Sequence, residues 1–395
     1  MSTESNTHVV EHGFWDYTTP GAGGMEHYES DDYLRLLDDM SEAGMNSICV
    51  LPKWLTTGYR SRLPFLDQHA DNLTTRSDNA LLRDFLTEAK RRGIKPWLGV
   101  VIAMYPVEHV RTPAINVYPS ENGDLRLGVS IGVYDLDCPE VWDYAPQVLA
   151  ELCREFPCIE GVVIEVEHAG VALPYRIPLY NRWAVENGQP AFEQINNPLN
   201  LRSIDVTPWR LYTTQRRIEF MRHLRAAASG YRGEWAMLCE TGRSPYLLTQ
   251  EVNLSRLARE CPWCAAVSYE CGYDKSIHRL GMMELAVEDP KQAGLKTFYL
   301  PRGVMTWGRW PMALPLEESW RRDMEDILRF SPQGVWWFGS GCVGTGRGYH
   351  VDAERLRQSR FTDGIQARLR LLECARGISE ARKARTPLDL EQKKP

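Results

Sequence analysis

Apolar stretches alternate along the chain with stretches in which apolar and polar residues follow a helical spacing. Short apolar stretches bounded by glycine, proline or charged residues are typical of strands that are covered on both faces of a parallel sheet. Eight such strands are predicted, over residues 13–17, 46–54, 94–104, 161–167, 234–240, 265–270, 296–304 and 334–339.

Helices are predicted between these strands. Glycine commonly follows the last residue of a helix, so Gly44 and Gly93 mark the ends of the first two helices. The predicted helices cover residues 30–43, 78–92, 140–156, a long segment ending near Gly230, and residues 250–260, 277–287 and 317–330. Regular alternation of strands and helices is typical of βαβ units and a parallel sheet.

Eight units in one chain favour closure into a single (β/α)8 (TIM) barrel over an open, doubly wound sheet. The open sheet of dinucleotide-binding proteins has Gly-x-Gly-x-x-Gly after its first strand, and Gly21-Ala-Gly-Gly24 does not match that spacing. A length of 395 residues suits one barrel with insertions. We expect the barrel over residues 1–384 and a polar C-terminal tail over residues 385–395.

Two long segments interrupt the alternation after the third and fourth strands. Residues 105–139 contain proline, asparagine and glycine and are expected to include a short hairpin, and residues 169–207 form the second insertion. Long loops at strand ends commonly shape a binding pocket.

Net charge and composition limit the kinds of partner that the chain is expected to bind. The net charge is −6 and the basic residues are dispersed among acids, so nucleic acid is not an expected partner. The N-terminal residues lack the pattern of a secretory signal, and no apolar run reaches membrane-spanning length. We therefore expect a cytoplasmic protein with no membrane partner, and leave homo-oligomerisation open.

The ten cysteines form no regular framework and are expected to be reduced. Cys261-Pro-Trp-Cys264 has the spacing of a redox or zinc motif. Because no second Cys-x-x-Cys pair completes a four-ligand zinc site, a structural role is favoured.

Acidic residues stand at the ends of several predicted strands, where barrel enzymes place their chemistry. Glu165 and Glu167 share the fourth strand and point to the same side of it, while Glu240 and Glu270 end the fifth and sixth strands. Burial raises the pKa of a carboxyl group, as a general acid near neutral pH requires. We predict Glu167 as the acid/base residue and Glu270, or alternatively Glu240, as its partner. A buried ion pair with arginine or lysine is the structural alternative for the pair in strand four.

The fourth strand resembles those of glycoside-hydrolase barrels. Ile159-Glu-Gly-Val-Val-Ile-Glu-Val-Glu167 is similar to the Asp-Gly-x-Asp-x-Asp-x-Glu pattern of chitinase-like barrels, whose last Glu is the acid. The resemblance implies that Glu167 is the acid, Glu165 the assisting carboxylate and Glu160 the leading acid. Large retaining β-glycosidases instead have Asn before the strand-four Glu, where this chain has Val166, and a Glu ending strand seven, which here has no acid. The resemblance is therefore to the superfamily, and it implies hydrolysis of a glycoside.

Aromatic and polar residues near the same strand ends are expected to bind a carbohydrate substrate. Flat rings stack on sugars, and basic side chains bind hydroxyl or carboxylate groups. The expected binding residues are Trp15, Asp16, Lys53, Trp54, Tyr105, His168, Tyr269, Arg302, Trp307 and Trp337.

Two other functions remain open at this point. The glycine-rich residues 339–348 after strand eight suit phosphate, which favours a sugar-phosphate or sugar-acid lyase or isomerase, with a divalent metal held by Glu165, Glu167, Glu240 and Glu270. A barrel that binds carbohydrate without cleaving it is the third hypothesis. Since His12 stands alone and no His-x-His opens strand one, no metal and no cofactor are expected.

Overall fold

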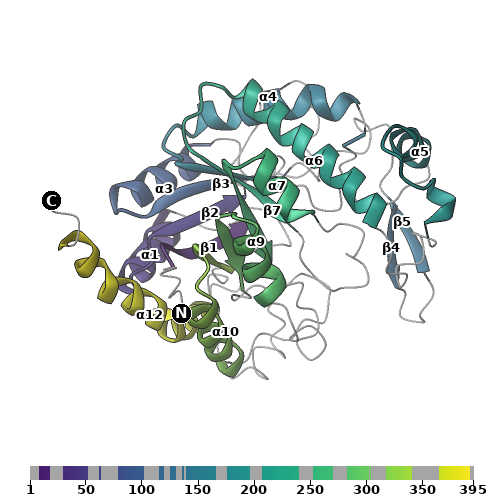
Figure 1. Ribbon diagram of the computed structural model, residues 1–395. Helices are drawn as coiled ribbons and strands as arrows, with labels where there is room; N and C mark the ends of the chain where they lie inside the picture. Colours follow the sequence, from purple (N-terminus) through teal and green to yellow (C-terminus); the bar gives the residue numbers. More distant parts are fainter. Residues whose placement is uncertain are drawn as a thin grey trace.

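Eight parallel strands close into one barrel, in the order β1-β10-β9-β8-β7-β6-β3-β2. The structure is a computed structural model that describes residues 9–17, 30–51, 62–63, 79–101, 115–119, 125–129, 136–137, 139–165, 176–195, 207–239, 252–269, 283–301, 303, 317–339 and 364–391. Helices surround the barrel (Figure 1). The predicted (β/α)8 barrel is confirmed.

Each predicted strand corresponds to a strand of the barrel. The strands are β1 (Glu11–Tyr17), β2 (Ser47–Leu51), β3 (Lys95–Val101), β6 (Gly161–Glu165), β7 (Glu234–Cys239), β8 (Cys264–Tyr269), β9 (Thr297–Leu300) and β10 (Gly334–Phe338). The outer helices are α1 (Ser30–Glu42), α3 (Ala80–Arg91), α4 (Pro139–Glu155), α6 (Thr207–Ala227), α7 (Leu254–Glu260), η5 (Glu284–Glu288) with α9 (Asp289–Gln292), α10 (Glu317–Phe330) and α12 (Gly364–Glu391).

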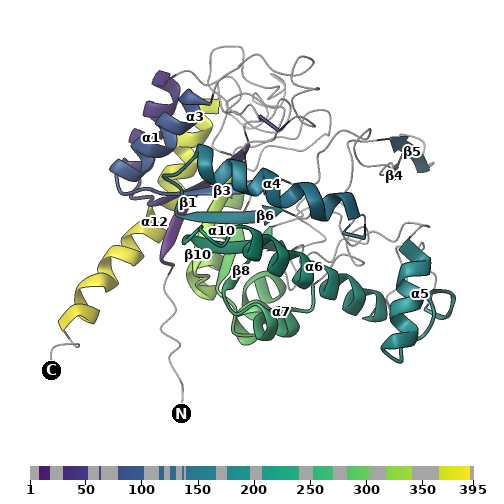
Figure 2. The same cartoon turned by 90° about the horizontal axis from the view of Figure 1, so that it is seen from above.

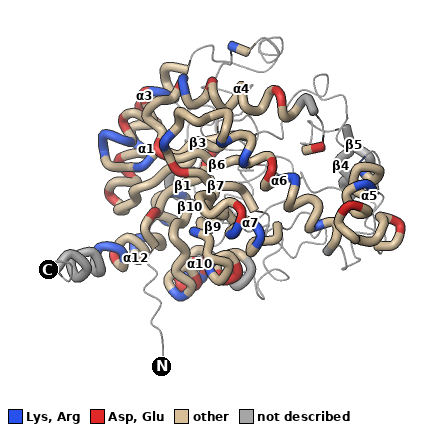
Figure 3. Tube along the Cα trace, turned by 45° about the horizontal axis from the view of Figure 1, so that its top comes forward, with Lys and Arg blue, Asp and Glu red and all other residues tan. Residues whose placement is uncertain are grey.

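Helix α3 shows how the sequence pattern produces these elements. Its buried residues are Leu82, Phe85, Leu86 and Ala89, which form one face at helical spacing. The chain leaves the helix through Gly93, whose φ of +75° is readily adopted only by glycine. Acidic and basic residues are interspersed along the described helices (Figure 3).

The two predicted insertions contain structure of their own. Strands β4 (Ile115–Pro119) and β5 (Leu125–Val129) form the expected antiparallel hairpin. The second insertion contains α5 (Ile177–Glu186) and the short helix η4 (Phe192–Gln194), which the sequence pattern did not predict. Helix α5, η4 and the start of α6 enclose an aromatic cluster that is separate from the barrel core. In both views α5 and the hairpin lie on the side of the molecule opposite α12 (Figures 1 and 2).

The last helix, α12, packs against α1 and α10. Its buried Arg368 forms an ion pair with Asp39 of α1, with 2.7 Å between Nη2 and Oδ2. The helix continues to Glu391, so the boundary predicted at residue 385 falls inside a helix. None of the helices in the described part of the chain is both long and apolar enough to cross a membrane.

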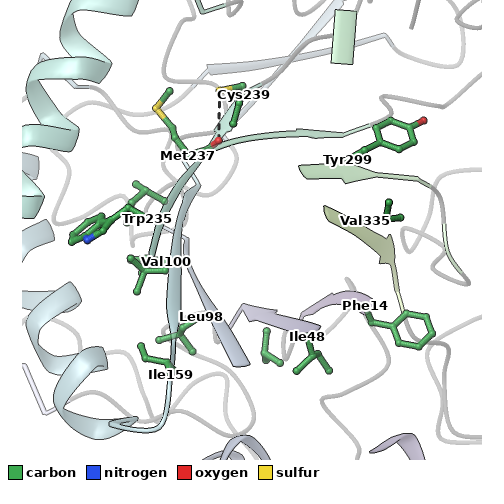
Figure 4. Close-up of a cluster of buried hydrophobic side chains, with 14 of the residues drawn as sticks. Phe14, Ile48, Leu98, Val100, Ile159, Trp235, Met237, Cys239, Tyr299 and Val335 are labelled. Atoms are coloured by element: carbon green, nitrogen blue, oxygen red, sulfur yellow. Dashed lines mark hydrogen bonds between the residues drawn. The ribbon is translucent and has the colours of Figure 1, made fainter. Parts of the chain in front are cut away.

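Side chains of the barrel strands divide between two cores because successive residues face opposite sides. The core between the barrel and its helices includes Phe14, Ile48 and Trp235 (Figure 4). The core inside the barrel contains Trp15, Cys49, Leu51, Trp97, Val163, Ala236, Leu238, Ala265, Val267, Phe298, Leu300 and Trp336.

The amino end of the barrel is filled by an ion-pair network. Lys95 Nζ lies 2.7 Å from Glu11 Oε1 and 2.6 Å from Glu234 Oε1. Glu11 also accepts hydrogen bonds from Ser47 Oγ at 2.9 Å and from Trp97 Nε1 at 2.8 Å. These side chains occupy the amino end of the barrel, so the carboxyl end is the candidate for a reaction site.

Candidate active site at the carboxyl end of the barrel

Glu165 is the last residue of β6 and faces the barrel interior. Val163, two residues earlier on the same strand, belongs to the interior core, and alternation places Glu165 on the same face. The Glu165 side chain is buried, with 1% of the residue exposed. The pKa of the Cys49 thiol is raised by burial and then by the negative charge of Glu165, so the two side chains share one region of the interior.

The chain places three strand ends next to one another. Strands β6, β7 and β8 are neighbours in the barrel and end at Glu165, Cys239 and Tyr269. The catalytic candidates Glu167, Glu240 and Glu270 follow these strand ends in sequence but lie outside the described residues. The same is true of the binding candidates Lys53, Trp54, Tyr105, His168, Arg302 and Trp307.

Trp15, which we expected to bind substrate, belongs to the interior of the barrel. Its ring centroid lies 6.0 Å from that of Trp336, and in the register of β1 and β2 it is paired with Cys49. The ring is fully buried, so Trp15 forms part of the barrel filling. The ring faces of Trp336 and Phe298 stack beside it with centroids 4.3 Å apart.

Two residues that we expected to bind substrate face the helices instead. Asp16 is buried and has the parity of Phe14, which belongs to the outer core. Trp337 also belongs to the outer core, and its Nε1 donates a hydrogen bond to His12 Nε2 at 3.0 Å. The expectation rested on nearness to the strand end, whereas the alternation of side chains turns Trp336 inward and Trp337 outward. Glu160, the leading acid of the resemblance, lies at the amino end of β6 and pairs with Lys90 at 3.1 Å.

Sequence reasoning missed a buried ionic cluster beside the second insertion. Asp137 precedes α4, and its carboxylate pairs with Arg176 at the start of α5 and with Arg216 of α6. These residues are far apart in the chain and show no common spacing. The one feature of the sequence that points to this cluster is Asp137 just before the predicted helix, and it does not show which arginines pair with Asp137.

The Cys-x-x-Cys segment has the environment of structural thiols. Cys261 and Cys264 are buried and free. Burial is the largest cause that raises the pKa of both thiols, which disfavours the reactive thiolate. Within the described residues, no three His, Cys, Asp or Glu side chains gather closely enough to hold a metal ion.

The described fold is that of the (β/α)8 barrels found in glycoside hydrolases. The chain is similar to the PgaB (BpsB) glycoside hydrolase domain from Bordetella bronchiseptica, with 14% identity and a TM-score of 0.56 over 89% of this chain and 99% of that one. It is also similar to a β-galactosidase from Halorubrum lacusprofundi, with 13% identity and a TM-score of 0.60 over 94% of this chain and 57% of that one.

A third similar structure is a GH20 exo-β-N-acetylglucosaminidase from Vibrio harveyi, with 14% identity and a TM-score of 0.51 over 98% of this chain and 58% of that one. The chain thus spans little more than half the length of the last two enzymes. No protein-family model matches the chain, and no curated protein matches its sequence. At these identities the likeness establishes the barrel fold alone.

Proposed function

We propose that the chain is a glycoside hydrolase that cleaves an oligosaccharide or small glycoside by carboxylate general acid/base catalysis at the carboxyl end of the barrel. The observation that carries the proposal is the inward-facing, buried Glu165 at the end of β6. A second glutamate, Glu167, follows two residues later in the sequence. The named activities of the structurally similar barrels support the proposal.

In this mechanism Glu167 protonates the glycosidic oxygen as the bond to the anomeric carbon breaks. Glu240 or Glu270, which follow the two next strands of the barrel, supplies the second carboxylate. That group either attacks the anomeric carbon, at a separation of about 5 Å from the acid, or activates water at a wider separation. Glu165 assists because a neighbouring carboxylate favours the protonated form of an acid.

The remaining binding candidates are proposed to hold the sugar. Aromatic rings of Trp54, Tyr105, Tyr269 and Trp307 would stack on its apolar faces. Lys53, His168 and Arg302 would bind its hydroxyl or acidic groups. Asp16 and Trp337 are not part of this proposal, since both face the helices.

The test is hydrolysis of phenyl β-galactoside and phenyl N-acetyl-β-glucosaminide by wild type and by Glu167→Gln, because the poor phenol leaving group depends on proton donation. Loss of a general acid is expected to lower kcat by about 10²- to 10⁴-fold. Glu160→Gln is the matched control because Glu160 directly precedes β6 at the amino end of the barrel, where its side chain is 41% exposed. Its rate should equal that of wild type.

Wild-type rates in Glu167→Gln would overturn the assignment of the acid. Activity that a chelator abolishes would favour the metal-dependent lyase or isomerase instead. Comparing Glu240→Gln with Glu270→Gln then identifies the partner, which should show the larger fall in kcat.

A further inference from the structure

Four arginines, here called the arginine cluster, lie where helices α6 and α7 pack together before β8 begins. Arg222 and Arg225 are one turn apart on α6, and Arg256 and Arg259 are one turn apart on α7. Arg222 Nη1 lies 3.3 Å from Glu260 Oε2, and Arg256 Nε lies 2.7 Å from Glu260 Oε1. A hydrogen bond from Arg256 is the largest cause that lowers the pKa of Glu260. The charges of Arg222 and Arg259 lower this pKa further, so three guanidinium groups surround one carboxylate.

The fourth arginine, Arg225, is held against an aromatic ring. Its guanidinium carbon lies 4.2 Å from the centroid of the Trp263 ring, within the range of cation–π attraction. Trp263 packs in turn against the outer core, with its ring centroid 5.9 Å from that of Trp235. Burial raises the pKa of the Cys261 thiol, and the charges of Arg222 and Arg225 oppose that rise, which places both guanidinium groups near the thiol. The cluster therefore surrounds the start of the Cys-x-x-Cys segment.

The positive charge of the arginine cluster exceeds the negative charge beside it. In the part of the chain that the structure describes, neither Arg225 nor Arg259 forms an ion pair, and the other two arginines share Glu260. Like charges one turn apart on a helix repel each other, and two such pairs meet here at one carboxylate. The excess is local, because the whole chain has a net charge of −6. An anion bound among these guanidinium groups would relieve the repulsion that remains.

The end of helix α3 shows the same groups in a balanced arrangement. Arg91 and Arg92 share Glu88, with 2.6 Å and 2.7 Å between their nitrogen atoms and Oε1, and Arg92 also pairs with Asp38. Two cations thus meet two carboxylates. Attraction to the carboxyl end of a helix accounts for a basic residue in the last turn, which α3, α6 and α7 all have. It does not account for four arginines around one carboxylate.

We propose that the arginine cluster is a binding site for a phosphate group, either free or carried by a sugar. A guanidinium group matches phosphate in charge and in geometry, because two parallel N–H groups can bind two phosphate oxygens. Each guanidinium has five N–H donors, more than the contacts with Glu260 use. The site lies at the amino end of β8, whereas the proposed hydrolysis takes place at the carboxyl end of the barrel. The inference therefore does not depend on the proposed function.

The experiment is isothermal titration calorimetry at constant ionic strength with wild type, Arg225→Gln, Arg259→Gln and Arg91→Gln. Inorganic phosphate and glucose 6-phosphate are titrated separately, and binding by the cluster is the difference between wild type and Arg225→Gln. Arg225 and Arg259 are exposed, so both variants are expected to fold, which thermal unfolding checks. Arg91→Gln is the matched control, because Arg91 is an exposed arginine in the last turn of α3, where the charges are balanced.

Arg225→Gln and Arg259→Gln should each raise the Kd for phosphate by on the order of 10-fold, because each removes hydrogen bonds to a charged group. Arg91→Gln should leave the Kd at the wild-type value. Phosphate at about ten times its Kd should raise the Tm of wild type by about 2 °C, and that of the two cluster variants by less. A purely structural role of these arginines would lower Tm in the variants without changing the Kd.

Tighter binding of glucose 6-phosphate than of inorganic phosphate would identify a phosphorylated sugar as the ligand, and the opposite order, or equal binding, would identify the free anion. Failure of both to bind, or a wild-type Kd in either Arg225→Gln or Arg259→Gln, would overturn the inference. Phosphate held by the glycine-rich residues 339–348 would give the second of these results. A chain that shows the expected changes in Kd but hydrolyses neither phenyl glycoside would contradict the proposed function alone.

Discussion

Trp337 of β10 donates its indole N–H to Nε2 of His12 on β1, across 3.0 Å, in the core between the barrel and its helices. Because Nε2 accepts this bond, the proton of the neutral imidazole is on Nδ1, which lies 3.1 Å from Ser379 Oγ on α12. The fully buried His12 thus connects two barrel strands to the last helix only in its neutral form.

Acidification should therefore destabilise the fold through His12. Burial, with the charge of Arg382 as a second cause, lowers the pKa of His12 to about 3, whereas an unfolded histidine has a pKa of about 6.5. Below about pH 6.5 the unfolded state takes up a proton that the folded state refuses, so the contribution is complete above that pH and is lost as pH falls towards 3. The expected slope is about 1.4 kcal/mol per pH unit.

Urea unfolding at a series of pH values between about 7 and 5 measures this slope. Carboxylates also titrate as the pH falls, so the relevant quantity is the difference between wild type and His12→Gln, which has no titratable ring. His223→Gln is the control, because His223 is exposed and bonds the Trp142 carbonyl oxygen at 2.8 Å. The interpretation is wrong if His12→Gln keeps the wild-type dependence on pH.

The ion-pair network at the amino end of the barrel predicts unequal effects for two lysines. Lys95→Met removes the cation beside the buried Glu11 carboxylate and should lower the free energy of unfolding by about 3–5 kcal/mol. Lys90→Met breaks an ion pair whose side chains are 49% and 41% exposed and should cost at most about 1 kcal/mol. Urea unfolding of both variants provides the test, and equal losses would contradict the buried network.

The Lys95 ammonium also holds the pKa of Glu234 below its usual range. Burial alone would raise that pKa, but the hydrogen bond and charge of Lys95, with Lys296, outweigh it. The lowered pKa of Glu234 stabilises the fold fully at pH values above the pKa of the carboxyl group in the unfolded chain. This contribution is lost as the pH falls through the lowered pKa of the folded chain. In Lys95→Met the free energy of unfolding should therefore fall less steeply as the pH is lowered through the range in which Glu234 titrates.

The sequence was sufficient to predict the barrel because its signals are local. Apolar strands and the glycines that end helices act within a few residues, as Gly44 and Gly93 show with φ of +68° and +75°. The strand expected over residues 46–54 is described over Ser47–Leu51, and residues 52–54 lie outside the described residues. Helix α5 was missed because its aromatic residues pack against α6, a contact that no local spacing reveals.

The site was harder to predict because it depends on which way side chains face. Alternation predicted that Glu165 and Glu167 point to the same side of their strand, and in the structure Glu165 continues the inward register of Val163. The same rule would have turned Asp16 and Trp337 outward, had the register of their strands been used. The Asp137 cluster joins residues separated by dozens of positions, and such pairing is a property of tertiary structure alone.

Gly161 provides a test of the packing inside the barrel. A Cβ atom at this position would lie 2.1 Å from Cε3 of Trp97. The Trp97 ring is held by its bond to Glu11 and by Trp336, whose centroid lies 5.2 Å away, so it has little room to move. Gly161→Ala should lower the free energy of unfolding by about 3 kcal/mol.

Gly230→Ala is the matched control, because a Cβ atom there meets nothing within 4 Å. Its stability should change by no more than about 0.5 kcal/mol. Urea unfolding of the two variants measures the difference between their free energies of unfolding. A Gly161→Ala chain as stable as the control would show that the interior is less tightly packed than the contact with Trp97 implies.

Thiol labelling tests the interpretation of the Cys-x-x-Cys segment. Burial raises the pKa of Cys261 and Cys264, so under native conditions iodoacetamide should label neither before Cys158, which is partly exposed. Cys153, whose pKa burial raises to about 12, should also react slowly. Mass spectrometry of labelled peptides gives the order of reaction, and the same reaction in urea shows that every thiol reacts once exposed. Rapid labelling of Cys261 and Cys264 in the native chain, or their oxidation to a disulfide with the barrel intact, would instead make the segment a redox site.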